Sequence, residues 1–168
     1  MSDYRLQRPV VWAENLLKVL IWLNWIFAIA FAVVLFASFA VADGIVRRGG
    51  SGGIPPESLT VVRIVLSIGL IVVPLAHVAL TRLRDIVATV RVGDPFVPDN
   101  ARRLTAIAWA MLAIMLCDLV FGYVGMVMDP QMGWSFSLTG WLAVLLLFVL
   151  ARVFEAGTRM RDEIEGTV

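Results

Sequence analysis

Four long apolar stretches alternate with polar ones along the chain. They cover approximately residues 16–42, 60–81, 104–128 and 138–154. An α-helix rises about 1.5 Å per residue, so each stretch has roughly the length needed to cross the hydrocarbon core of a bilayer. Lipid offers the backbone no hydrogen-bond partners, which favours helices over other structures. The pattern therefore predicts an all-α fold with four transmembrane helices.

The polar interval 82–103 separates the second apolar stretch from the third. We expect the second helix to continue through Val92 and to end at Gly93, because glycine adopts the left-handed conformation that follows many helices. The two prolines after it disfavour helix and predict an extended turn. Either Asp99 or Asn100 is expected to cap the third helix.

Basic residues predict the orientation of the helices. They flank the start of the first helix, fill the interval 82–103 and follow the fourth helix in the tail 155–168, whereas only Arg47, Arg48 and Arg63 lie on the other side. Cytoplasmic loops of membrane proteins have an excess of lysine and arginine. We therefore expect one domain, an antiparallel four-transmembrane-helix bundle with both termini inside (N-in/C-in), located in the cell inner membrane. The charged tail is expected to extend the last helix into water.

Composition agrees with this fold and excludes several kinds of site. Of 168 residues, 60% are hydrophobic and 16% are charged, whereas soluble domains have about 25% charged residues. A net charge of +1 gives no field for direct nucleic-acid binding. Cys117 and His77 are the only residues of their kinds, so neither an intrachain disulfide nor a Cys–His metal cluster is expected. The N-terminal segment is mixed in charge and is not expected to be a cleavable signal peptide.

Asp118 lies in the middle of the third apolar stretch. A carboxylate there costs about 2.5–3.5 kcal/mol on insertion scales. Gly122 and Gly125 follow on the same helical face, so this face is expected to point at neighbouring helices and not at lipid. Asp118 could be a proton-linked or ligand-binding acid. It could equally be a structural acid that bonds to a neighbouring helix, with Arg63 as the candidate partner.

Four further residues in the apolar stretches could line a ligand site with Asp118. Asn24 and His77 fall at similar depth, and Trp109 and Trp141 could form an apolar pocket. The alternatives are an interhelical hydrogen bond for Asn24 and His77, and ordinary packing for the two tryptophans. A single axial haem ligand is the one haem role open to His77. The identity of any ligand or cofactor stays open.

The interval 82–103 is longer than a minimal connection between two spans. Together with the acidic residues of the tail, it could form a docking surface for a soluble partner; alternatively, the basic interval and the acidic tail could pair with each other. The candidate docking residues are Arg84, Arg91, Asp94, Pro95, Phe96, Asn100, Arg103, Glu155 and Arg161.

Two stretches of the chain resemble a known family. GDPFVPDNARRL, preceded by LRDIVATV, and the ending VFEAGTRMRDEIEGTV are similar to the bacterial domain-of-unknown-function 2975 (DUF2975) family. Its members have four membrane helices, a G-x-PF-x-x-x-NA-x-RL segment between the second and third, and an F-x-x-G before a charged TV ending. The matching positions are Gly93, Pro95, Phe96, Asn100, Ala101, Arg103, Leu104, Phe154, Gly157, Thr167 and Val168.

The resemblance implies a kind of partner and no catalytic residues. Genes of the family often accompany a small helix-turn-helix regulator, which implies a cytosolic transcription factor as partner. We therefore predict a non-enzymatic membrane sensor that binds a small apolar ligand or senses membrane state and docks such a regulator, with movement at Pro74 and Gly93. The alternative is an oligomeric transporter or channel for a small solute or ion that uses Asp118. An enzyme is not expected, because no carboxylate pair, metal cluster or nucleophile with a base is evident.

Overall fold

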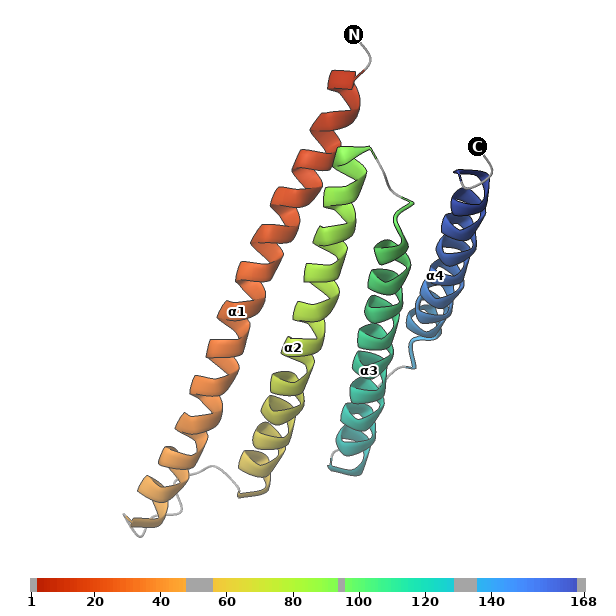
Figure 1. Cartoon of the computed structure of the whole chain (residues 1–168). Helices are drawn as coiled ribbons and strands as arrows, with labels where there is room; N and C mark the ends of the chain where they lie inside the picture. Colours follow the sequence, from red (N-terminus) through yellow and green to blue (C-terminus); the bar gives the residue numbers. More distant parts are fainter. Residues whose placement is uncertain (1–2, 48–55, 94–95, 129–135, 166–168) are drawn as a thin grey trace.

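The computed structural model describes residues 3–47, 56–93, 96–128 and 136–165. These residues form four helices and no strand: α1 (Asp3–Arg47), α2 (Pro56–Val92), α3 (Pro98–Met128) and α4 (Leu138–Glu165) (Figure 1). All four are long and apolar enough to cross a membrane. The predicted all-α four-helix fold is confirmed, and the chain is a multi-pass membrane protein.

The helix ends show where the sequence pattern predicts well and where it does not. α2 runs to Val92, and Gly93 follows with a φ of 90°, so the predicted glycine stop is confirmed. The predicted cap of the third helix is wrong. α3 begins at Pro98, because a fixed φ and a missing N–H suit proline to the first position of a helix. Asp99 and Asn100 therefore lie inside the first turn.

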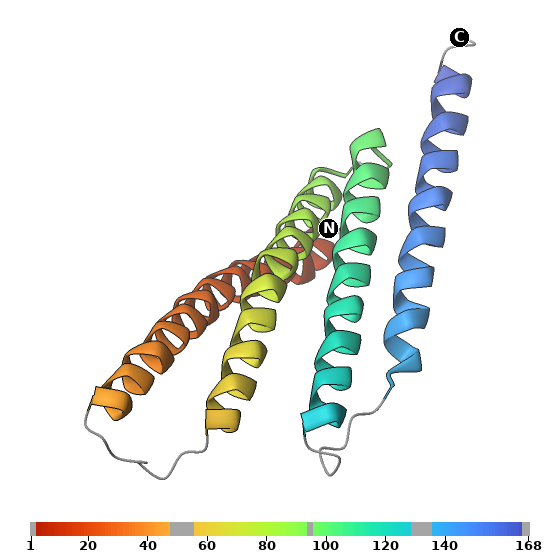
Figure 2. The ribbon, with the colours of Figure 1, turned by 90° about the horizontal axis from the view of Figure 1, so that it is seen from below.

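The helices lie side by side in chain order as an open antiparallel bundle. Two perpendicular views show the same order (Figures 1 and 2). Within the described ranges, α1 packs on α2, α2 on α3 and α3 on α4, and no other pair of helices is in contact. α3 has a neighbour on both sides and contains much of the small core, including the fully enclosed Ala108. The outer helices expose large apolar side chains, which lipid covers in a membrane.

Small residues allow close approach at two interfaces. A Cβ atom built on Gly69 of α2 would lie 3.0 Å from the ring of Phe31 on α1. A Cβ atom on Gly140 of α4 would lie 2.6 Å from the sulfur of Met115 on α3. Because lipid supplies no hydrophobic force between helices, such tight van der Waals packing stabilises their association.

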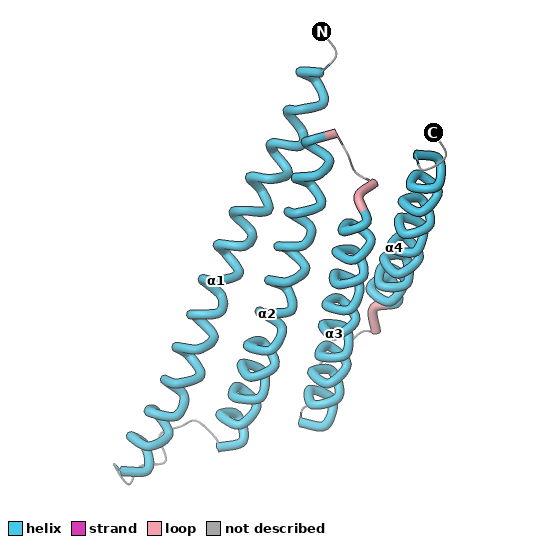
Figure 3. Tube along the Cα trace, in the orientation of Figure 1, coloured by secondary structure: helices cyan, strands magenta, loops and turns pink. Residues whose placement is uncertain are grey.

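Both termini and the connection between α2 and α3 lie at one end of the bundle, called here the motif end (Figure 3). The end of α1, the start of α2, the end of α3 and the start of α4 lie at the opposite end, called here the far end. At the motif end α2 and α4 continue beyond the apolar stretches to Val92 and Glu165. Each extension has eleven helical residues, 82–92 in α2 and 155–165 in α4. Eleven residues lengthen a helix by roughly 16 Å. The predicted extensions of both helices are confirmed.

Candidate functional site at the motif end

Asn100 is the polar centre of the motif end. Its side chain is fully buried. The amide Nδ2 donates a hydrogen bond of 2.7 Å to the hydroxyl of Thr89 on α2, and Oδ1 accepts one of 2.8 Å from Arg103. Buried amides are stabilising only when their hydrogen bonds are made. Asn100 therefore joins α3 to α2 and orients Arg103, and its enclosure leaves no side-chain surface for a partner.

Phe96 connects the loop between α2 and α3 to α4. Its ring stacks on Phe154, with centroids 5.3 Å apart and planes 26° apart. A Cβ atom on Gly157 would lie 3.7 Å from the Phe96 ring, so the ring rests against the helix surface there. Phe96 as a whole residue is nevertheless 48% exposed. The connection and the extension of α4, which are distant in sequence, thus form one surface.

Charged residues of the interval pair with α1 or with near neighbours. Arg91 contacts the carboxylate of Glu14 on α1 at 3.0 Å, and Lys18 contacts the same carboxylate at 2.9 Å. Arg84 lies 3.3 Å from Asp85, the next residue along the chain. Glu14 therefore fixes the start of α1 to the end of α2.

The tail forms ion pairs within its own helix. Glu155 contacts Arg152 at 2.9 Å and Arg159 at 3.6 Å. The candidate docking residue Arg161 also makes a polar or electrostatic contact, so its side chain is not free of partners. The alternative in which the basic interval pairs with the acidic tail does not involve Glu155. Two candidate docking residues, Asp94 and Pro95, lie outside the described residues.

A hollow of about 480 Å³ lies at the elbow between α2 and α3. Ala88, Thr89, Val92 and Val97 form most of its wall, and Asp85 and Arg103 add one charge of each sign. Val92 is 81% exposed. Because it lies beyond the apolar stretches, lipid is not expected to cover it. This elbow hollow is therefore an apolar site with a polar edge, next to Phe96 in the chain.

The five candidate ligand residues are distributed over separate interfaces. Asn24 donates a hydrogen bond of 3.2 Å to the carbonyl of Val73, the residue before Pro74. His77 meets Trp25 edge-on, with centroids 5.4 Å apart. Its Nδ1 atom is buried and has no hydrogen-bond partner in the part of the chain that the structure describes. Asn24 and His77 thus belong to the interface between α1 and α2.

The two tryptophans of the candidate ligand site have aromatic neighbours. Trp109 meets Phe148 edge-on at 5.5 Å, across the interface between α3 and α4. Trp141 stacks on Phe136 at 6.1 Å near the start of α4. The structure therefore does not bring either tryptophan together with His77.

Asp118 is half-buried on α3, and Gly122 and Gly125 on its face are buried. The suggested pairing of Asp118 with Arg63 is wrong. Arg63 donates hydrogen bonds to the hydroxyl and carbonyl of Ser38 on α1, at 3.3 and 3.0 Å, and lies 4.1 Å above the ring of Phe39. Because α1 and α3 do not touch within the described ranges, a side chain that faces α1 cannot reach Asp118.

A family model described as protein of unknown function (DUF2975) matches residues 8–168. The chain belongs to the DUF2975 family. The resemblance found from the sequence is thereby confirmed. Comparisons with curated proteins and with solved structures gave no match.

The structure explains why several positions of the DUF2975 pattern occur together. Gly93 ends α2, Asn100 joins α3 to α2, and Phe96 packs on Phe154 and Gly157. Two residues of this arrangement were missed by sequence reasoning. Thr89 and Glu14 lie in helices where one polar residue among many gives no signal of its partner.

Proposed function

We propose that this chain is a non-enzymatic regulatory protein of the cell inner membrane, and that its motif end faces the cytoplasm and docks a cytosolic helix-turn-helix transcription regulator. The contact of Phe96 with Phe154 and Gly157 supports docking most strongly, because it joins the connection to the α4 extension where the last apolar stretch ends. The kind of partner rests on the family resemblance.

The chemistry of this surface fits a protein partner. Phe96 and Val92 expose apolar surface outside the spans, and the elbow hollow lies beside them. Exposed apolar patches with polar rims are typical of interaction sites. A partner's apolar side chain would fill the hollow, while Asp85 and Arg103 at its edge would bind polar groups.

Coupling between the bundle and the docking surface would run through the interface of α1 with α2. Asn24 bonds to the carbonyl before Pro74, His77 packs on Trp25, and Glu14 binds Arg91 at the motif end. A small apolar ligand, or a change in membrane state, that shifts α1 along α2 would move Arg91 beside the docking surface. This is a population shift between two packings of one interface.

Site-specific crosslinking tests the docking proposal. A photoreactive residue at Val92 in native membranes should crosslink a helix-turn-helix protein, and the same group at Tyr123, which is 70% exposed, should not. Phe96→Ala should reduce the crosslink. Phe136→Ala is the matched control, because Phe136 is also a stacked, half-exposed ring on α4's side of the molecule but at the far end. Crosslinks to lipid alone at Val92 contradict the proposal.

Accessibility labelling tests the orientation separately. Cys117 is first replaced by serine, and a cysteine is then placed at Val97. Labelling only after the cytoplasmic side is opened supports the proposed orientation. Labelling from the outside of intact cells overturns both the orientation and the docking proposal.

Transport through Asp118 is less well supported. An open row of helices encloses no path across the membrane, so several copies would be needed. Asp118 has no hydrogen bond or ion pair to any residue in the described ranges, which is the one observation in favour. Flux in proteoliposomes that disappears with Asp118→Asn would support transport, and flux equal to that of empty liposomes would remove it.

A further inference from the structure

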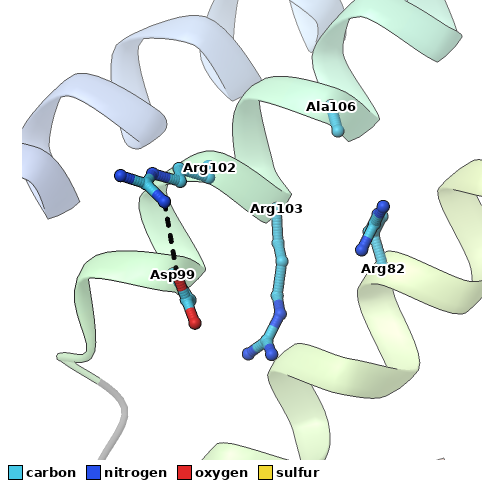
Figure 4. Close-up of a pocket in the computed structure, with 5 residues that line it drawn as sticks. All are labelled: Arg82, Asp99, Arg102, Arg103 and Ala106. Atoms are coloured by element: carbon cyan, nitrogen blue, oxygen red, sulfur yellow. Dashed lines mark ion pairs between the residues drawn. The ribbon is translucent and has the colours of Figure 1, made fainter.

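Three arginines contribute to the lining of a hollow of about 320 Å³ between α2 and α3 (Figure 4). Arg82 comes from α2, and Arg102 and Arg103 come from the first turns of α3; Asp99 and Ala106 complete the lining. With one carboxylate against three guanidinium groups, the lining has an excess of positive charge. We call this the arginine hollow.

The cationic charge of the hollow is only weakly neutralised. The contact between Asp99 and Arg102 is long, at 3.9 Å, and both side chains are exposed. Arg103 donates a hydrogen bond to the side-chain amide of Asn100. This amide orients the guanidinium group but, being neutral, does not compensate its positive charge. Arg82 makes no hydrogen bond or ion pair with residues in the described ranges. The start of α3 adds the partial positive charge of a helix N-terminus.

The arginine hollow lies at the boundary between lipid and water. Arg82 directly follows the apolar stretch 60–81, and Arg103 directly precedes the stretch 104–128. Ala106, a small apolar residue inside that stretch, forms the wall toward the membrane. Phosphate groups of lipids lie at this level, and basic pockets between transmembrane helices bind anionic headgroups. Guanidinium groups also match the geometry of phosphate oxygens.

We propose that the arginine hollow binds a phosphate group, supplied by the headgroup of an anionic phospholipid. The phosphate lies between Arg82 and Arg103, and Arg102, whose side chain points away from Arg82 (Figure 4), adds positive charge at the rim. The acyl chains leave past Ala106 into the bilayer. This site is independent of the docking proposal, because its lining differs from the elbow hollow except for Arg103.

Lipid titration of the purified full chain, followed by native mass spectrometry, tests the proposal. Phosphatidylglycerol should bind more tightly than phosphatidylcholine. Each of Arg82→Gln and Arg102→Gln should weaken phosphatidylglycerol binding about fivefold, and the double variant about thirtyfold, at the usual contribution of a basic residue near an anionic surface. Asp99→Asn, which removes the opposing carboxylate, should tighten binding severalfold.

Arg152→Gln is the matched control. Arg152 lies at the same end, its side chain is 83% exposed against 86% for Arg102, and each contacts an acidic residue three positions away. This variant should change phosphatidylglycerol affinity by less than about twofold. The double change of Arg82 and Arg102 to lysine keeps the charge and should retain most of the affinity, which separates loss of binding from loss of folding.

Three results overturn the proposal. The first is equal affinity for phosphatidylglycerol and phosphatidylcholine. The second is an equal loss of affinity in Arg152→Gln, which would mean a diffuse attraction to the whole motif end. The third concerns the source of the phosphate: inorganic phosphate that binds in an Arg102-dependent manner, with lipid binding unaffected by the variants, would overturn the lipid assignment.

Discussion

Asn100 and Asp118 lie on one face of α3, about five helical turns apart, and their surroundings differ. Asn100 is fully enclosed and bonds to Thr89 and Arg103. Asp118 is half-buried and makes no hydrogen bond or ion pair to any residue that the structure describes. One helix thus presents a satisfied polar group at the motif end and an unsatisfied one in the apolar middle.

The difference separates polar residues that stabilise the fold from those available for another role. A buried polar group contributes to stability when its partners are in place and is costly when they are absent. By this criterion Asn100 stabilises the interface of α3 with α2. Asp118 has no such partner among the residues that the structure describes, so by the same criterion it joins no pair of described helices.

Replacement of Asn100 should produce the largest effect. Asn100→Ala removes both hydrogen bonds of a fully buried side chain and leaves a cavity where its amide packed. The free energy of unfolding should therefore fall by about 2–3 kcal/mol. Reversible unfolding in mixed micelles, followed by circular dichroism, measures it. Asp118→Asn on the same face is the control and should change stability by less than about 0.5 kcal/mol. Equal costs for the two variants would contradict the comparison.

Loss of the Phe96 ring should have an intermediate and local effect. Phe96→Ala removes the contact with Phe154, and such aromatic pairs contribute about 1 kcal/mol beyond buried area. Hydrogen exchange of backbone amides in residues 154–165 should become faster, while exchange in α1 stays unchanged. Phe136→Ala should instead affect the start of α4. Exchange that rises equally over all four helices would show that Phe96 supports the whole fold.

Loss of the Glu14 carboxylate should have the smallest effect. Glu14→Gln removes the ion pairs with Arg91 and Lys18, and exposed pairs are weak and screened by salt. A slight decrease of the melting temperature at low salt should vanish at high salt. Glu155→Gln, whose ion pairs lie within one helix, is the control for charge removal without an interface. A large decrease that persists in salt would place Glu14 among the main stabilising residues.

Local features of the fold could be predicted from the sequence. Apolar length predicts each helix, and the position of Gly93 predicts the end of α2. These features depend on residues close together in the chain. The family resemblance also singled out Phe96 and Phe154, in two separate segments of the family pattern, although it did not show that they touch.

Lateral contacts could not be predicted in the same way. Inside a bilayer, both the lipid-facing and the helix-facing sides of a span are apolar, so periodicity does not show which helices are neighbours. The expected partner of Asp118 failed for this reason, since Arg63 faces α1. Asparagine is a common helix cap, so the sequence alone favours that role for Asn100. In the structure α3 already begins at Pro98, and the Asn100 side chain instead donates a hydrogen bond to Thr89.

The serial order of the helices has a consequence for assembly in the membrane. Each new helix packs on the one inserted before it, so no helix has to wait for a partner from later in the chain. Synthesis from the N-terminus can therefore build the interfaces one after another. The stacking of Phe96 on Phe154 forms last, so the motif end is completed only when translation has finished the fourth helix.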